Sequence, residues 1–183
     1  AFDPPLSPAK QAAIARLGMG VLDKLWLRFD RVAWPETPDW LEHLAVPPQN
    51  WAQWLSLAPY DRAPVLLGFA GGYEAERLEG LPDAAVLDSA LVALRDMFGS
   101  NFPAPLAAQW TRWRGDPFSL GGYSYPAVGS TPADRHALSS REGRVGFGGE
   151  ACHAEQWGTA HGALLSGEAA AQGILETLET DRS

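Results

Sequence analysis

The sequence has few cysteines, little positive charge and no long apolar run, and each of these excludes some classes of protein. A single cysteine, Cys152, among 183 residues excludes a framework of disulfides within the chain and fits a reducing compartment. Lys and Arg number 14 against 22 Asp and Glu, and the formal net charge of −8 argues against a nucleic-acid partner. No apolar run approaches the ~20 residues of a membrane span, and no signal-peptide layout opens the chain. We therefore expect a soluble, cytoplasmic protein without a membrane partner.

Several patterns that carry chemistry are also missing. The four histidines have no metal-ligand spacing, so we expect no metal site. No GxSxG turn is present, which sets aside a serine hydrolase. A GxGxxG turn after a strand, which holds the pyrophosphate of a dinucleotide, is absent too, because GFAGG at residues 68–72 has the wrong spacing.

Apolar and aromatic residues, in contrast, are plentiful. A hydrophobic content of 46% over this length supports one substantial core or two small ones. The eight tryptophans fill such a core or line a ligand cleft. The acidic balance suits a cationic substrate and equally suits an ordinary soluble surface.

Residues 144–178 give the most informative pattern in the chain. Val145 and Phe147 alternate with glycines, which predicts a buried strand. A polar loop with Glu150 follows, and then a helix that opens at Gly158 and is rich in small residues. Another element or a ring system can approach such a helix closely. The free N–H groups of its first turn and its dipole favour an anion, such as a phosphate or the charge on a reduced flavin ring.

The other segments give weaker signals. The Trp- and Pro-rich residues 35–59 could cover a sheet or shape a substrate entrance. The polar, turn-rich residues 131–142 predict a surface loop. The remaining expected elements are a helix after the Ser7-Pro8 cap, strands over residues 21–29, 64–70 and 109–113, and a helix from an Asp83 cap to Phe98.

One signature resembles a known family. GGEACHAEQWGTAHGALLSGEAAA at residues 148–171 resembles the C-terminal FAD-contacting signature of the flavin-containing amine oxidases, close to the polyamine and spermine oxidases and the lysine-specific histone demethylases. FDPPL at residues 2–6, GMGVLDKLWLRFDRVAWP at residues 18–35 and WRGDPFSLGGYSY at residues 113–125 agree in the same order. The resemblance spans almost the whole chain and covers the C-terminal portion of a family member.

The resemblance implies an α/β and α+β fold, with the C-terminal part of a Rossmann-like FAD-binding lobe and a mixed-sheet substrate-binding lobe. Residues 1–20 would form a segment of the FAD-binding lobe, residues 21–131 the substrate-binding lobe, and residues 132–183 the C-terminal FAD-binding segment. Because the glycine-rich turn is absent, about half of the cofactor site would come from an N-terminal FAD-binding portion or subunit.

The resemblance also implies which residues contact FAD. The acid Glu150 would touch the ribityl or ring portion of the cofactor. Residues 121–123 contain no cysteine where the monoamine oxidases attach their flavin, so binding would be noncovalent. The cofactor-binding residues would be Gly149, Glu150, Gly158, Thr159 and Ala160.

Lys24 matches a family lysine that holds a water near flavin N5, and this would be its catalytic role. Without the resemblance, a lysine between apolar neighbours on a strand is usually solvent-facing. Family positions that line the substrate channel are occupied by aromatic residues here, whose faces attract cations by roughly 0.5 to 2 kcal/mol per contact. Gln156 and Trp157 depart from the usual aromatic sandwich around the amine. The implied substrate-binding residues are Trp113, Phe118, Tyr123, Gln156 and Trp157.

The implied function is FAD-dependent oxidation of a small cationic amine, either a polyamine or a secondary or primary amine. Hydride passes to flavin N5, and oxygen is reduced to hydrogen peroxide. Two alternatives stay open. A noncatalytic fragment or binding module could keep the amine-oxidase fold without FAD, which the absent glycine-rich turn favours. An L-amino-acid oxidase-type flavoenzyme would need an arginine fork for the substrate carboxylate.

Overall fold

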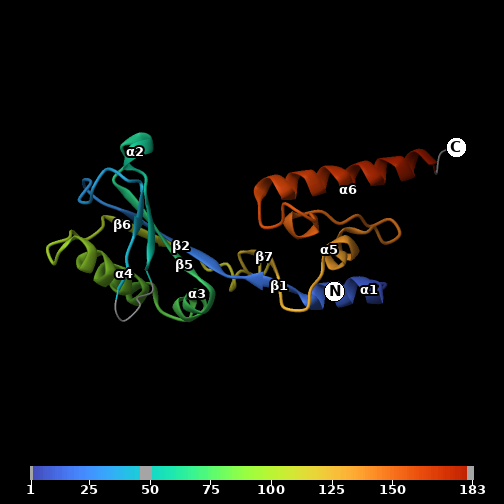
Figure 1. Cartoon of the computed structure of the whole chain (residues 1–183), viewed down its shortest axis with the longest axis horizontal. Helices are drawn as coiled ribbons and strands as arrows, with labels where there is room; N and C mark the ends of the chain where they lie inside the picture. Colours follow the sequence, from blue (N-terminus) through green and yellow to red (C-terminus); the bar gives the residue numbers. More distant parts are fainter. Residues whose placement is uncertain (1, 46–50, 181–183) are drawn as a thin grey trace. The chain divides into compact units, whose positions relative to one another are not determined.

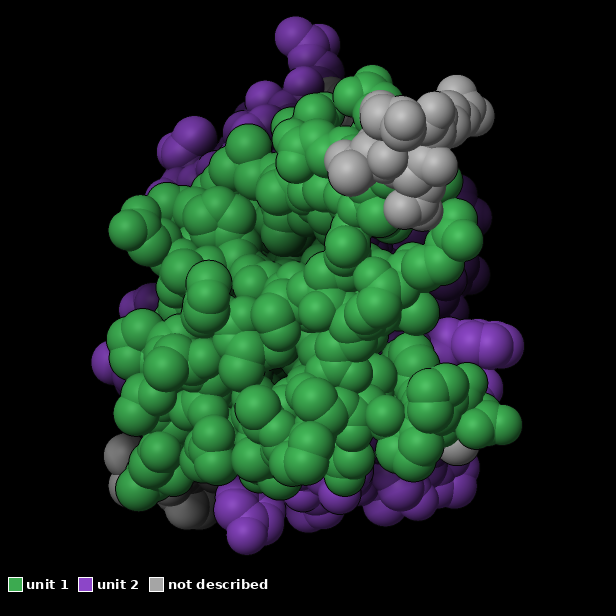
Figure 2. Space-filling view, turned by 90° about the vertical axis from the view of Figure 1, so that its right-hand side faces the viewer, with its two compact units in different colours: residues 1–20, 123–183 green, residues 21–122 purple. Residues whose placement is uncertain are grey.

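The chain divides into two compact units in a computed structural model that describes residues 2–45 and 51–180. Unit 1 comprises Ala1–Gly20 and Tyr123–Ser183, and unit 2 comprises Val21–Gly122; Figure 2 colours the surface by unit. Residue 1, residues 46–50 and residues 181–183, which belong to the three expected domain segments, lie outside the described residues. The expected substrate-binding lobe extended to residue 131, whereas unit 2 ends earlier because the next strand pairs within unit 1.

A five-stranded sheet forms the body of unit 2 (Figure 1). The strand order is β3-β4-β5-β2-β6, and all the described pairs are antiparallel, so the sheet is antiparallel instead of mixed as expected. Side chains of β2 alternate as expected, with Leu25 and Leu27 buried and Trp26 on the opposite, exposed face. The strands are β2 (Leu22–Arg28), β3 (Trp40–Glu42), β4 (Gln53–Ser56), β5 (Val65–Gly71) and β6 (Ala107–Trp110).

Three helices complete unit 2, namely α2 (Ala58–Asp61), α3 (Gly72–Glu79) and α4 (Asp83–Phe98). The apolar stripe expected on α4 is confirmed as core packing, since Val86, Ala90 and Leu94 are fully buried. Asp83 was expected to cap this helix, but Pro82 occupies the cap and Asp83 is the first helical residue. The helix ends at Gly99, whose φ of 98° lies in the left-handed region.

Tryptophans fill much of the core of unit 2. Trp51 and Trp54 are fully buried, with ring centroids 5.7 Å apart, and Trp51 meets Trp110 edge to face at 5.4 Å. In the described part of residues 35–59, strands β3 and β4 extend the sheet at one edge, so this segment belongs to the sheet instead of covering it as expected. The expected strand over residues 109–113 lies earlier, at Ala107–Trp110, because Thr111 turns its side chain towards Asp23.

Unit 1 combines helices with a two-stranded antiparallel ribbon of β1 and β7. Helices α1 and α5 lie side by side (Figure 1). Ser7 caps α1 as expected, by accepting the N–H of Lys10 at 3.3 Å. None of the described helices combines the length and apolar character that crossing a bilayer requires. The elements are α1 (Pro8–Arg16), β1 (Leu17–Gly20), β7 (Tyr123–Pro126), α5 (Pro132–Ser139), the 3-10 turn η1 (Glu150–Cys152) and α6 (Ala160–Thr180).

Two expectations about unit 1 are wrong. The surface loop expected over residues 131–142 contains helix α5, whose Asp134 carboxylate accepts the Thr131 N–H at 2.7 Å. The buried strand expected around Val145 and Phe147 is absent, and Val145 is exposed and forms one isolated bridge with Glu142. Its glycines pack this segment against helix α6 instead of pairing it with a strand.

Candidate functional site

The carboxylate of Glu150 ties three elements of unit 1 together. Its Oε1 accepts the N–H of Ser124 at 2.8 Å, and its Oε2 accepts the Ser124 hydroxyl at 2.8 Å. Oε2 also accepts the N–H of Gly158 at 2.5 Å. These bonds join β7, η1 and the loop before α6, so Glu150 fixes where the final helix begins.

The N-terminus of α6 is capped by Thr159. Its hydroxyl accepts the N–H of Gly162 at 3.0 Å and donates to the carbonyl of Gln156 at 2.6 Å. The first intrahelical bond of α6 runs from the N–H of Ala163 to the Thr159 carbonyl at 3.1 Å, so the N–H groups of Ala160 and His161 have no intrahelical partner. Together with the helix dipole they form an electropositive end that favours an anion.

Tyr123 lies beside this helix start. A β-carbon placed on Gly158 would be 3.5 Å from Cδ2 of the Tyr123 ring. Tyr123 is 40% exposed, so part of it is accessible to a ligand. The structure thus brings the predicted residues Tyr123, Glu150, Gly158, Thr159 and Ala160 together within unit 1.

The loop before Glu150 approaches α6 as closely as its small residues predict. Gly149 donates its N–H to the Ser166 hydroxyl at 3.0 Å, and that hydroxyl donates to the Gly149 carbonyl at 2.6 Å. A β-carbon on Gly148 would lie 3.0 Å from the α-carbon of Gly167. At Gly149, φ is 128° and no described atom lies within 4 Å of such a β-carbon, so open space adjoins its backbone.

Sequence reasoning missed Arg135, which lies directly behind this site. The residue is 3% exposed, and its Nη1 donates to the Ser124 hydroxyl and to the Ala151 carbonyl, both at 3.0 Å. Its guanidinium lies 4.8 Å from the centre of the Trp157 ring. Burial lowers the pKa of Arg135, and the charge of Glu150 opposes this. Arg135 gave no signal because it falls in the segment that was expected to be a loop.

Gln156 and Trp157 occupy the turn between η1 and α6. The Gln156 side chain is exposed, and its Oε1 lies 2.7 Å from Nε2 of His161. This contact gives His161 a structural hydrogen bond. Trp157 is half-buried against Arg135, which leaves part of its ring accessible.

Three predicted site residues belong to unit 2. Lys24 is half-buried on β2, and its N–H donates to the Thr111 hydroxyl at 2.8 Å. Trp113 is 39% exposed and Phe118 is 96% exposed, both in the turn that follows β6. Their roles next to a flavin stay predictions.

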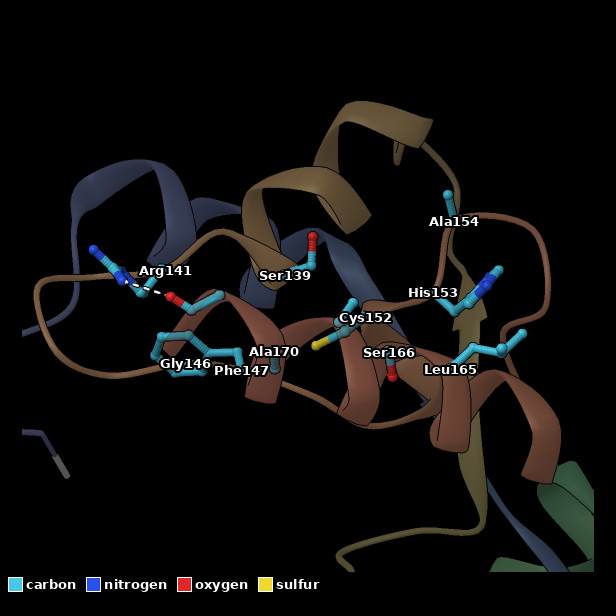
Figure 3. A pocket seen from close by; sticks show the side chains of 12 residues that line it. Ser139, Arg141, Gly146, Phe147, Cys152, His153, Ala154, Leu165, Ser166 and Ala170 are labelled. Carbon is cyan, nitrogen blue, oxygen red and sulfur yellow. Dashed lines mark hydrogen bonds between the residues drawn. The ribbon is translucent and has the colours of Figure 1, made fainter. Parts of the chain in front are cut away.

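A groove of about 400 Å³ runs along α6 in unit 1 (Figure 3). Cys152 lies in it, and burial raises the pKa of its thiol, as for a structural rather than a reactive cysteine. Arg141 at one end donates to the Gly173 carbonyl at 3.1 Å. The lining residues are Ser139, Arg141, Gly146, Phe147, Cys152, His153, Ala154, Leu165, Ser166, Ala169, Ala170 and Gly173.

Comparison with known proteins places this arrangement in a family. Residues 1–175 match the family described as flavin containing amine oxidoreductase. The chain belongs to this flavin amine oxidase family. The resemblance seen in residues 148–171 is therefore confirmed, and a flavin is the cofactor of the family.

Curated relatives of this flavin amine oxidase chain are longer than it is. "Probable polyamine oxidase 4" of Arabidopsis thaliana is 38% identical over 93% of the chain and 34% of its own length. "Peroxisomal N(1)-acetyl-spermine/spermidine oxidase" of Homo sapiens is 34% identical over 95% and 39%. "Possible lysine-specific histone demethylase 1" of Drosophila melanogaster is 35% identical over 91% and 20%. The chain thus spans between a fifth and two fifths of these relatives.

The expected fold class is confirmed by solved structures. Wild-type putrescine oxidase bound to putrescine superposes with a TM-score of 0.77 over 96% of this chain and 39% of the other, at 18% sequence identity. At that identity the likeness shows the fold alone.

The residues present in unit 1 fit a flavin. The capped start of α6 offers free N–H groups, the Tyr123 ring lies beside it, and open space adjoins the backbone of Gly149. The free N–H groups suit an anionic edge of a ring system. The Tyr123 ring and the open space suit its flat surface. The described residues hold no group of three or more His, Cys, Asp or Glu that could bind a metal ion.

Proposed function

We propose that the protein containing this chain oxidises a small cationic amine with the help of noncovalently bound FAD. One observation carries the proposal, namely the capped start of α6 held by Glu150 and flanked by Tyr123, in a chain of the flavin amine oxidase family. When bound, FAD would accept hydride from the carbon next to the amine nitrogen and pass the electrons to oxygen, giving hydrogen peroxide.

In this proposal the chain's residues hold and polarise the flavin. The N–H groups of Ala160 and His161 and the dipole of α6 would stabilise the negative charge that a bound flavin develops. The open space beside the Gly149 backbone would leave room for a flat ring. Glu150 keeps Gly158 in place, and it would also touch the ribityl or ring portion of FAD, as the family resemblance implies.

Lys24 has the catalytic role that the family resemblance implies. An ammonium has three donors and no acceptor, which suits it to hold a water in a fixed position. Its backbone is anchored by the hydroxyl of Thr111 at 2.8 Å, and its side chain is half-buried.

For the substrate we propose a polyamine or another secondary or primary amine. Exposed aromatic rings can attract a cation, and each unit carries such rings, namely Tyr123 in unit 1 and Trp113 and Phe118 in unit 2. The net charge of −8 also favours a cationic substrate. The names of two relatives, a probable polyamine oxidase and an acetyl-spermine/spermidine oxidase, support the same substrate class. Arg112 and Arg114 do not form a free carboxylate fork, because they pair with Asp83 and Glu76.

The proposed partner is an N-terminal FAD-binding portion or subunit. Relatives carry more than half of their length outside the matched region, and the GxGxxG turn is absent from these 183 residues. The groove along α6 is lined mostly by small and apolar residues, with Arg141 and His153 among them, so a packed element of such a portion could lie in it.

The test is the visible spectrum of the chain, alone and together with an N-terminal FAD-binding portion of a relative. We expect a yellow complex in the second preparation that bleaches and releases peroxide with spermine, putrescine or a monoamine. Lys24→Met should bind the flavin equally and slow its reduction or reoxidation. A colourless protein in both preparations would support the second candidate, a noncatalytic binding module, which the absent glycine-rich turn favours.

A further inference from the structure

A buried acid lies next to the proposed catalytic lysine. Asp23 on β2 is fully buried, and its Oδ1 accepts the Thr111 hydroxyl at 2.9 Å and the N–H of Trp113 at 3.1 Å. Its other oxygen, Oδ2, is also buried and accepts no hydrogen bond from the described residues. An ionised carboxylate with an unpaired buried oxygen is costly, so this atom needs a partner.

The partner is a second acid, Glu79 at the end of α3. Consecutive backbone N–H groups of the turn after β6 donate to the two acids, which brings their carboxyls next to each other. Asp23 accepts the N–H of Trp113, and Glu79 accepts the N–H of Arg114 at 2.9 Å and the N–H of Gly115 at 3.0 Å. The last two donors hold the Glu79 carboxyl in place, and burial favours the protonated form of Asp23 beside it.

The surrounding charges do not neutralise Asp23. The Arg112 guanidinium donates to the carbonyls of Glu79 and Leu81 at 3.3 and 2.9 Å and pairs with Asp83. The Arg114 guanidinium pairs with Glu76 of α3. Burial and then Glu79 raise the pKa of Asp23 to about 6, while Trp113 and Thr111 act in the opposite direction. Among the described residues, the charged group that acts on Asp23 is Glu79 of α3.

We propose that Asp23 and Glu79 share one proton, and that this carboxyl pair positions Lys24 and Trp113 for the reaction. The connection is short. The N–H of Lys24 donates to the Thr111 hydroxyl, which donates to Asp23, and Asp23 also receives the N–H of Trp113. Asp23 therefore links the strand that carries Lys24 to the turn that carries Trp113. The shared proton does not depend on the proposed function, whereas its effect on the reaction rests on the proposed role of Lys24.

The pair should make the stability of the chain depend on pH. Because the pKa of Asp23 is raised in the folded chain, the folded state holds more protons than the unfolded state between about pH 4 and pH 6. The stability contributed by the shared proton is full below this window and is lost as pH rises through it. Above it, two carboxylates repel each other behind the turn.

Asp23→Asn is the informative variant, because its amide can donate to Glu79 without titrating while its oxygen still accepts from Thr111 and Trp113. Thermal unfolding of the chain should give a melting-temperature difference, variant minus wild type, that grows as pH rises from about 4 to 6 and then levels off. The matched control is Asp88→Asn, an exposed aspartate of the same unit, for which the difference should stay flat. A flat difference for Asp23→Asn would overturn the shared proton.

Infrared spectroscopy gives a second, independent measurement on the same variants. The wild-type chain at pH 5 should show stronger protonated-carboxyl absorption than both Asp23→Asn and Glu79→Gln, and Asp88→Asn should match the wild type. Absorption in Asp23→Asn equal to that of the wild type would assign the proton to another acid and refute the inference, even if a variant folds less well.

The effect on the reaction needs the FAD-loaded protein. The pH profile of flavin reoxidation should have an inflection near pH 6 that Asp23→Asn removes, whereas Lys24→Met should slow reoxidation at every pH. Unchanged rates in Lys24→Met would refute the lysine's proposed role and with it the positioning part of the inference. An inflection that persists in Asp23→Asn would refute the positioning role alone.

Discussion

Buried charged side chains fix the turns of this molecule. Lys10 is fully buried, and its Nζ donates to the carbonyls of Ala137, Leu138 and Ser140 at the end of α5, at 3.0, 2.5 and 2.7 Å. Arg135 and Glu150 do the same around the start of α6. In each case a charged group satisfies backbone groups that the chain's turns would otherwise leave unpaired.

Arg135→Met should lower the free energy of unfolding by about 2 kcal/mol, because the Ala151 carbonyl and the Ser124 hydroxyl lose a buried donor. Arg144→Met, at an exposed arginine of the same unit, should change it little. Chemical denaturation of the two variants measures the difference. Equal losses would mean that the hydrogen bonds of Arg135 contribute nothing to stability.

Glu150→Gln should cost roughly 1–2 kcal/mol of stability, because an amide offers one acceptor oxygen where the carboxylate offers two to Ser124 and Gly158. The start of α6 should loosen as well, which amide hydrogen exchange at Gly158 reports. Glu168→Gln, an exposed glutamate on α6, is the matched control. Protection at Gly158 that is equal in both variants would contradict this role.

At the scale of elements, close packing decides which glycines are required. A β-carbon on Gly68 of β5 would lie 2.7 Å from Trp54 and 3.0 Å from Trp51, both of which are fully buried. At Gly71, on the same strand, the nearest atom would be an ordinary 3.7 Å away. The tryptophan pair can therefore stack in the core only because β5 has no side chain at residue 68.

Gly68→Ala should destabilise the chain by about 1–3 kcal/mol through overpacking. Gly71→Ala should stay within about 0.5 kcal/mol of the parent. Thermal or denaturant unfolding followed by tryptophan fluorescence compares the two, since the rings concerned are the reporters. A larger loss for Gly71→Ala than for Gly68→Ala would contradict the packing argument.

The elements also show what a single sequence can reveal. β2 and α4 were predictable because their apolar residues recur with the period of a strand and of a helix. α5 was not, because its sequence is polar and its stability comes from tertiary contacts, the Lys10 cap and the 2.5 Å pair of Arg16 with Asp134.

The candidate site also contains residues that the sequence could predict and residues that it could not. Glu150, Gly158 and Thr159 could be found from a local signature, because neighbours in sequence are neighbours in space there. Arg135, Asp23 and Glu79 could not, since each acts through a partner more than ten residues away. Burial and pairing across such separations are properties of the fold and leave no local pattern.

At the scale of the whole molecule, unit 1 exposes apolar side chains along its last helix. Leu164 is 62% exposed, Leu165 46% and Leu175 54%. Adjacent exposed leucines of this kind favour association with another apolar surface. The proposed FAD-binding partner portion would supply such a surface, and without it a second copy of the chain can.

The chain alone should therefore self-associate as its concentration rises, and Leu165→Glu combined with Leu175→Glu should weaken that association at least tenfold. Sedimentation velocity measures it. Val92→Glu is the control, at a residue that is 55% exposed on α4 in unit 2. A chain that stays monomeric throughout, or a control as effective as the pair, would contradict the assignment of this surface.

The ribbon of β1 and β7 has a consequence for engineering. Gly20 is the register partner of Tyr123, so the two places where the backbone leaves and re-enters unit 1 are adjacent. A tight hairpin could bridge them, as in a two-residue type I′ connection. The hundred or so intervening residues would then be an excisable cassette, and exchanging that cassette between homologues would transplant one lobe without rebuilding the other.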